Sequence, residues 1–109
     1  MTESSEKLDL LIRQSQSGDT AAFGLLMQQH MDFAYRLALR FLGCREESRD
    51  VVQESFIKVW EHLAGFKLGH RFSTWLYRIV VNKATDRLRQ LQRASHNRWR
   101  TQMSRRPRL

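Results

Sequence analysis

The most informative stretch of the chain runs from Glu46 to Ala64 and reads EESRDVVQESFIKVWEHLA. Apolar residues recur in it at steps of three and four, which is the spacing of one buried helical face. The residues expected on that face are Val52, Phe56, Val59, Trp60 and Leu63. Gly65 follows and can adopt the left-handed conformation that ends a helix. The stretch therefore predicts a helix, about Glu46–Ala64, that packs one side against the rest of the protein.

The other side of this helix combines carboxylates with one apolar residue. At about 100° per residue, five positions fall within about 100° of arc. They are Asp50, Gln53, Glu54, Ile57 and Glu61. Two interpretations stay open: an interface for a partner, or an ordinary solvated face with a single exposed hydrophobic residue.

Helical spacing also continues upstream of this stretch. It predicts helices at about Ser5–Ser17 and Thr20–Leu42, because Gly18 can end the first, Asp19 can cap the second and Gly43 can end it. No part of the chain alternates with the period of two that a half-buried strand requires. The predicted fold class is therefore all-α, a compact bundle of about four helices.

The fourth helix is expected from about Thr74 to beyond Arg93, with Ser73 as its cap. Its apolar arc contains Leu76, Tyr77, Val80, Val81, Ala84, Leu88 and Leu91. The far edge, within about 60° of arc, carries Arg78, Asn82, Arg89 and Arg93. Arg and Asn combine phosphate contacts with hydrogen bonds to base edges, so this edge favours a nucleic-acid surface.

Three aromatic residues near these surfaces have two interpretations. Trp60, Trp75 and Tyr77 could stack on bases, but helical spacing favours core packing for each of them. Beyond about Ala94 the chain offers little for a core to hold, so residues 95–109 are expected to form a basic, disordered tail.

Charge is divided unevenly along the 109 residues. Residues 1–66 carry a net charge of −3 and residues 67–109 a net charge of +11, which gives +8 for the chain. A basic half attracts a polyanion by releasing its counterions, whereas an acidic half suits a basic partner. A merely solvated basic tail is the alternative.

Several classes of protein fit this sequence poorly. The single cysteine, Cys44, cannot form an intrachain disulfide, and no apolar run approaches the roughly 20 residues that span a bilayer. We therefore expect a cytoplasmic protein without membrane insertion. Paired carboxylates, a nucleophile constellation, a phosphate-cradling glycine loop and metal-ligand spacing are all missing from the sequence. We expect no catalytic residue, metal or cofactor, and no enzyme.

Three motifs resemble those of one family. Residues 50–60, DVVQESFIKVW, resemble the D-x-V-Q-E-x-F-x-K-x-W signature of extracytoplasmic-function sigma factors of the sigma-70 family. Residues 72–79, FSTWLYRI, with Asn82, Asp86, Arg87 and Leu88, resemble that family's F-x-T-W-L-Y-R-I-x-x-N-x-x-x-D-x-L/R-R segment. Residues 18–23, GDTAAF, resemble its G-D-x-x-A-F opening. The resemblance covers about Leu8 to Arg93.

The resemblance implies that residues 1–94 are region 2 of a bacterial sigma factor, which binds core RNA polymerase and recognises and helps melt the −10 promoter element. Part of the third helix would dock on the clamp helices of the largest catalytic polymerase subunit. The polymerase-binding residues expected there are Asp50, Gln53, Glu54, Ile57, Lys58 and Glu61.

The fourth helix and the loop before it would hold the non-template strand single-stranded, with one base turned out of the stack. The DNA-binding residues expected there are Lys67, His70, Arg71, Phe72, Arg78, Asn82, Lys83, Arg89 and Arg93. The loop, KLGHR at 67–71, departs from the family's R-G-[DE]-S-like sequence and is more cationic, which should favour strand capture over base discrimination.

A complete factor of this family continues into a second helical domain, region 4, which reads the −35 element. We expect region 4 to be absent here and the chain alone to bind weakly. Two other functions stay open. The chain could be a general nucleic-acid-binding helical module, or it could serve mainly as the target of an anti-sigma factor.

Overall fold

The computed structural model describes the backbone of residues 2–105 and the side chains of residues 6–95. The elements, in chain order, are α1 (Thr2–Gln16), α2 (Thr20–Leu42), α3 (Arg45–His62), the 3-10 turn η1 (Leu63–Gly65) and α4 (Phe72–Arg105). No strand forms within residues 2–105. The predicted all-α class and the four helices are therefore confirmed.

Tight caps set both ends of α2. The Asp19 carboxylate accepts a hydrogen bond from the backbone N–H of Ala22 at 3.1 Å. At the other end Gly43 has a φ of 65° and donates its N–H to the carbonyl of Leu39 at 2.8 Å. Glycine adopts this left-handed conformation at little cost, so the helix ends there. The cap predicted at Asp19 and the stop predicted at Gly43 are confirmed.

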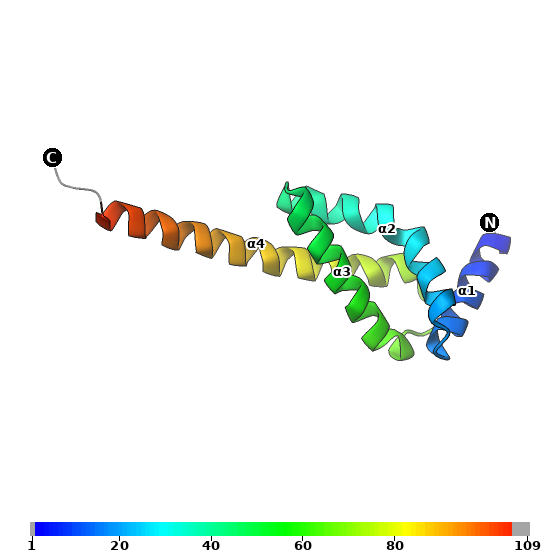
Figure 1. Ribbon diagram of the computed structural model, residues 1–109. Helices are drawn as coiled ribbons and strands as arrows, with labels where there is room; N and C mark the ends of the chain where they lie inside the picture. Colours follow the sequence, from blue (N-terminus) through cyan, green and yellow to red (C-terminus); the bar gives the residue numbers. More distant parts are fainter. Residues whose placement is uncertain (1, 106–109) are drawn as a thin grey trace.

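Helix α2 is the centre of the bundle. Helices α1, α3 and α4 all pack against it, and α3 also packs against α4 (Figure 1). All four helices, η1 and the following loop contribute to one core, and each fully buried Leu, Ile or Val side chain there stabilises the fold by roughly 1.5–3 kcal/mol. The core contains Ile12, Leu26, Met27, Ala34, Leu37, Ala38, Val51, Val52, Val59, Leu63, Phe66, Phe72, Leu76, Val80 and Ala84.

Two serines share the buried face of α3 with its valines. Ser48 and Ser55 are fully buried, and their hydroxyls donate to the carbonyls of Cys44 and Val51, one turn back, at 2.6 and 2.7 Å. A hydroxyl with such a local partner can be buried without leaving a polar atom unsatisfied. Helix α3 therefore packs closely on its neighbours with fewer apolar residues than an ordinary amphipathic helix.

The core packing expected for two of the three aromatic residues is wrong. Trp60 is 39% exposed and packs on the ring of Phe23 at a centroid distance of 4.7 Å, and Tyr77 is 46% exposed. Each follows a fully buried residue, Val59 or Leu76, and so lies about 100° around its helix from the core. Trp75 is half-buried and does pack against the core cluster.

Helix α4 begins earlier and ends later than expected. The backbone N–H of Trp75 donates to the backbone carbonyl of Arg71 at 3.2 Å. Ser73 therefore lies inside the first turn and is not the cap. At the other end the helix continues to Arg105, and the stretch 95–105, expected to be disordered, is helical.

This far part of α4 projects from the bundle, so that the molecule is 70 Å long and only 24 by 21 Å across (Figure 1). The physical reason is that no glycine or proline interrupts α4 before Pro107. Residues 106–109 of the predicted tail lie outside the described residues.

Candidate nucleic-acid interface

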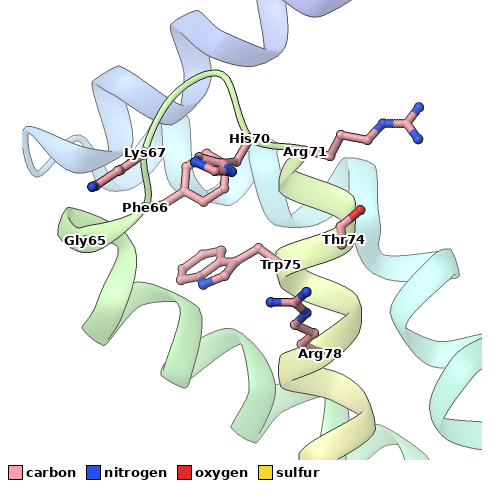
Figure 2. Close-up of a pocket in the computed structure, with 8 residues that line it drawn as sticks. All are labelled: Gly65, Phe66, Lys67, His70, Arg71, Thr74, Trp75 and Arg78. Carbon is pink, nitrogen blue, oxygen red and sulfur yellow. The ribbon is translucent and has the colours of Figure 1, made fainter.

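A cleft of about 430 Å³ opens beside the connection between α3 and α4. Its walls are the end of η1, the loop that follows and the first two turns of α4 (Figure 2). It is lined by Gly65, Phe66, Lys67, His70, Arg71, Thr74, Trp75 and Arg78. Four of the predicted DNA-binding residues, Lys67, His70, Arg71 and Arg78, are thus brought together.

Aromatic side chains form the floor of this cleft. The ring of Trp75 lies 5.1 Å from that of the buried Phe66 and 5.8 Å from that of Phe72, measured between centroids. Because the indole is only half-buried, part of it faces the cleft, and Figure 2 shows it between Phe66 and Arg78. An aromatic surface of this kind can stack with a base of any identity.

Cationic side chains form the rim. Lys67, Arg71 and Arg78 are exposed, and no Asp or Glu is among the described residues that line the cleft. Arg71 extends outward from the start of α4 (Figure 2). The loop reverses at Gly69, whose φ of 100° a residue with a side chain would rarely adopt. The rim therefore offers positive charge around an apolar floor.

Phe72 is a correction to the predicted DNA-binding set. Its side chain is 2% exposed and its ring contacts those of His30, Phe66 and Trp75. The first residue of α4 faces inward because α4 starts there and turns its first apolar position toward α2. Phe72 supports Trp75 from below and cannot contact a base itself.

The loop before α4 is anchored by a residue that sequence reasoning missed. The side-chain amide of Gln16, at the end of α1, donates to the carbonyls of Leu63 and Phe66 at 3.0 and 2.8 Å. Both amide hydrogens are used, one on the first residue of η1 and one on the residue that follows it. Nothing local in the sequence marks this contact, since the partners lie about 50 residues apart.

The remaining predicted DNA-binding residues lie further along α4. Asn82 and Lys83 line a second, smaller cleft between α3 and α4. Arg89 and Arg93 are exposed beyond it, and Arg89 lies 3.7 Å from the Asp86 carboxylate. That exposed pair contributes little to stability, roughly 0–1 kcal/mol, so Arg89 is available to other partners.

The residues of the predicted polymerase surface are accessible, and they lie along two edges of α3, one toward α2 and one toward α4. Asp50, Gln53, Lys58 and Glu61 are exposed, and Ile57 is 59% exposed. Gln53 and Ile57 line grooves between α2 and α3. Lys58 instead lines the cleft between α3 and α4, and Glu54 contacts α4 directly.

An ion-pair cluster explains the position of Glu54. The guanidinium of Arg87, on α4, donates to the carboxylates of Glu47 and Glu54, at 2.5 Å for Glu54. The hydrogen bond with Glu47 and the nearby charge of Glu54 raise the pKa of Arg87 above its ordinary value, against the effect of burial. Arg87 is therefore charged at any physiological pH and joins α3 to α4.

None of the described helices combines the length and the apolar character needed to cross a bilayer. The helical bundle, the aromatic cleft and its cationic rim define an all-α domain of the kind that can hold a nucleic-acid strand. Residues 26–94 match the family Sigma-70 region 2, and the chain belongs to this family. The resemblance drawn from the three motifs is thereby confirmed.

Curated relatives agree with this membership. The chain is 40% identical over 78 residues to the ECF RNA polymerase sigma factor SigW of Bacillus subtilis, covering 72% of this chain and 42% of SigW. It is also 40% identical to the RNA polymerase sigma-H factor of Pseudomonas aeruginosa, covering 72% of this chain and 40% of that protein. The chain thus spans about two fifths of the length of these relatives.

Two solved structures have the same fold. An engineered region 2 of sigmaE in complex with GTAAAA aligns with a TM-score of 0.75 and 38% identity, covering 80% of this chain and 90% of that one. CnrH in complex with the cytosolic domain of CnrY aligns with a TM-score of 0.67 and 31% identity, covering 90% of this chain and 65% of that one.

Proposed function

We propose that this chain is a sigma factor domain that binds core RNA polymerase and recognises and helps melt the −10 promoter element. Residues 1–94 would form the functional unit, and the protein would act in the bacterial cytoplasm by binding rather than by catalysis. Its DNA ligand would be the non-template strand of the −10 element.

The observation that carries this proposal is the cleft at the start of α4. Turning a base out of the stack costs a few kcal/mol, which the protein must offset. Stacking on an exposed aromatic or guanidinium surface contributes about 1–3 kcal/mol per base, and Trp75 and Arg78 present both. The structure of sigmaE region 2 with GTAAAA, which shares this fold, supports the assignment.

The rest of the strand would follow α4. Arg78, Asn82, Arg89 and Arg93 lie on one edge of the helix, and 15 residues at 1.5 Å each give this edge a length of about 22 Å. Backbone contacts along it position the strand without reading its sequence. The cleft would hold the base that is turned out of the stack, and affinity would come largely from the edge.

The polymerase would bind the exposed part of α3. Asp50, Gln53 and Glu61 surround the exposed Ile57, so an apolar centre has a polar rim, as in many protein interfaces. The clamp helices of the largest catalytic subunit would be the partner. Glu54 would contribute its charge to this surface while it stays paired with Arg87.

One second candidate is favoured by a specific observation. CnrH, which shares this fold, was solved with the cytosolic domain of CnrY. An anti-sigma factor that covers the α2–α3 grooves would keep the same surface from polymerase. This function is compatible with the first, because an anti-sigma factor acts by covering a surface that otherwise binds polymerase.

The test combines two binding measurements on the whole chain. Pull-down with core RNA polymerase should retain the chain, and a fluorescein-labelled single-stranded oligonucleotide containing GTAAAA should bind more tightly than its scrambled form or its duplex. A general nucleic-acid-binding module would bind all three DNAs alike and would not be retained by polymerase, and that pair of results would refute the proposal.

A further inference from the structure

The second cleft, of about 220 Å³, lies on the seam between α3 and α4. Lys58 reaches it from α3, and Ile79, Asn82, Lys83 and Asp86 line it from α4. The sequence assigned Lys58 to the polymerase surface and Asn82 and Lys83 to the DNA surface. In the structure these three residues share one cleft.

The register of α3 on α4 explains why Lys58 lies there. Glu54 pairs with Arg87, and the two helices run in opposite directions because η1 and a short loop connect them. One helical turn along α3 from Glu54 is Lys58, and one turn back along α4 from Arg87 is Lys83. The two lysines therefore meet at the same level of the seam, one turn away from the ion-pair cluster.

The charges of this cleft are not balanced. Arg87 pairs with the neighbouring carboxylates Glu47 and Glu54. Asp86 supplies one carboxylate to the cleft, so its one negative charge leaves a net charge of +1 from the two lysines, Lys58 and Lys83. Among the described side chains, no salt bridge engages Lys58 or Lys83. Two ammonium groups that face a narrow cleft repel each other unless an anion lies between them. The Asn82 amide adds a neutral donor to the same cleft.

The second cleft follows the first along α4. Arg78 lines the first cleft, which Trp75 also lines, and Asn82, one turn further along α4, lines the second. A strand whose base enters the first cleft would thus present its backbone to the second. Lysine binds phosphate as a compact point charge, and two lysines with an amide suit a single phosphodiester group.

We propose that Lys58, Asn82 and Lys83 form a phosphodiester-binding site for the captured strand, and that Lys58 contacts DNA rather than polymerase. This inference rests on the proposed function, since it places a phosphate of the same strand. It divides α3 into two edges: Gln53 and Ile57 on the α2 side for polymerase, and Lys58 on the α4 side for DNA.

The experiment uses the whole chain with Lys58→Ala, Lys58→Arg, Lys83→Ala and, as a matched control, Lys7→Ala, whose lysine is exposed on α1. Binding to the GTAAAA oligonucleotide is measured by fluorescence anisotropy over a range of NaCl concentrations. Removing one lysine–phosphate interaction with a single strand makes the plot of log K against log salt shallower by about 0.7. Polymerase affinity is measured in parallel.

Lys58→Ala and Lys83→Ala should each weaken DNA binding roughly fivefold at low salt, equally for all sequences, with the shallower salt slope. Lys58→Arg should retain the slope, and Lys7→Ala should change nothing. Polymerase affinity should stay within twofold. Replacing single phosphates with neutral methylphosphonates should reveal one linkage whose neutralisation weakens the wild type but not Lys58→Ala.

Two results would overturn the site while leaving the proposed function in place. One is a loss of polymerase affinity in Lys58→Ala with unchanged DNA affinity, which would return Lys58 to the polymerase surface. The other is an unchanged salt slope in Lys58→Ala and Lys83→Ala while the wild type binds DNA. A wild-type chain that binds no oligonucleotide would instead remove the proposed function, and the phosphate site with it.

Discussion

At the scale of single residues, Gln16 makes long-range contacts that the sequence does not indicate. It belongs to α1, outside residues 26–94, which match the Sigma-70 region 2 family. Its amide nevertheless donates to the carbonyls of Leu63 and Phe66 beside the cleft at the start of α4. A loop held in its binding conformation before the ligand arrives loses less entropy on binding. If the cleft holds DNA as proposed, helix α1 would contribute to binding without contacting DNA.

We predict that Gln16→Ala weakens binding of the GTAAAA oligonucleotide and costs about 1 kcal/mol of folding stability, because two hydrogen bonds disappear at a partly exposed site. Backbone amide exchange in residues 66–70 should become faster. Gln14→Ala, at an exposed position on the same helix, is the control and should leave both measurements unchanged. Equal exchange rates in the two variants would contradict the anchoring role.

For Phe72 we predict a loss of stability rather than a direct loss of DNA contact, because its side chain was expected to contact DNA and is buried instead. Phe72→Ala should lower the free energy of unfolding by about 3–5 kcal/mol, as for other large aromatic residues removed from a core. Phe72→Leu keeps most of the volume and should retain oligonucleotide affinity. Urea unfolding and anisotropy together check this. A stable Phe72→Ala variant with specific loss of DNA binding would mean that the side chain faces the ligand.

The sequence named the basic residues that the structure brings together at the cleft, but not which aromatic residues face it. Helical spacing separates a core side from a solvent side, so Arg78 and Asn82 could be placed on the exposed edge. It does not resolve residues at the boundary, such as Trp60, Trp75 and Tyr77, whose exposure depends on how closely the neighbouring helix approaches. Position 72 was missed because the start of α4 was placed two residues late.

At the scale of elements, the join between α3 and α4 is the feature on which both surfaces depend. Arg87 holds Glu47 and Glu54 together, and removing it would leave two carboxylates close to each other without a counter-charge. Arg87→Ala should therefore destabilise the protein by about 1–2 kcal/mol, less than for a fully buried pair, since these side chains are partly exposed.

Removing the two carboxylate charges together with Arg87 checks the same prediction. Arg87→Ala combined with Glu47→Gln and Glu54→Gln should recover part of the stability, because the uncompensated charges are gone. The pKa of Arg87 is raised above an already high value by its bonds to Glu47 and Glu54, so the stability from its charge is present at neutral pH and is lost only as the pH rises through the raised pKa. Thermal unfolding of these variants near neutral pH measures the effect. Equal melting temperatures for wild type and Arg87→Ala would show that the cluster does not join the helices.

Helix boundaries could be predicted where a local signal marks them. Gly65 does not adopt the left-handed conformation expected of it, because α3 ends at His62 and a 3-10 turn follows. Asp19 and Gly43 set the ends of α2 through their own side chain or conformation. The end of α4 had no such signal, and the scarcity of apolar residues was interpreted as disorder although no glycine or proline breaks the helix before Pro107. The Arg87 cluster could not be predicted, because it depends on the register between two helices.

At the scale of the whole molecule, charge and packing are divided along α4. Within the described side chains of this helix, full burial ends at Ala84, and beyond the ion pairs of Arg87 with α3 the helix projects from the bundle (Figure 1). Residues 95–109 add five arginines and no acidic residue. This part of the chain therefore adds positive charge without adding to the core.

Deleting residues 95–109 should accordingly leave the melting temperature unchanged within experimental error. It should weaken oligonucleotide binding at low salt and make the salt slope shallower, by equal factors for GTAAAA and a scrambled sequence, because the deleted charges attract the backbone only. A large fall in melting temperature would show that the projecting helix packs on the bundle.

The central claim is that two separate surfaces bind two different partners, and a double dissociation tests it most directly. Asp50→Arg reverses an exposed charge on α3, and Arg71→Ala with Arg78→Ala removes two cations from the rim of the cleft. Affinities for core RNA polymerase and for the GTAAAA oligonucleotide are measured for both variants. We predict that Asp50→Arg loses polymerase and keeps DNA, whereas the double variant loses DNA and keeps polymerase. If either variant lost both partners while remaining folded, or lost neither, the two-surface account would be contradicted.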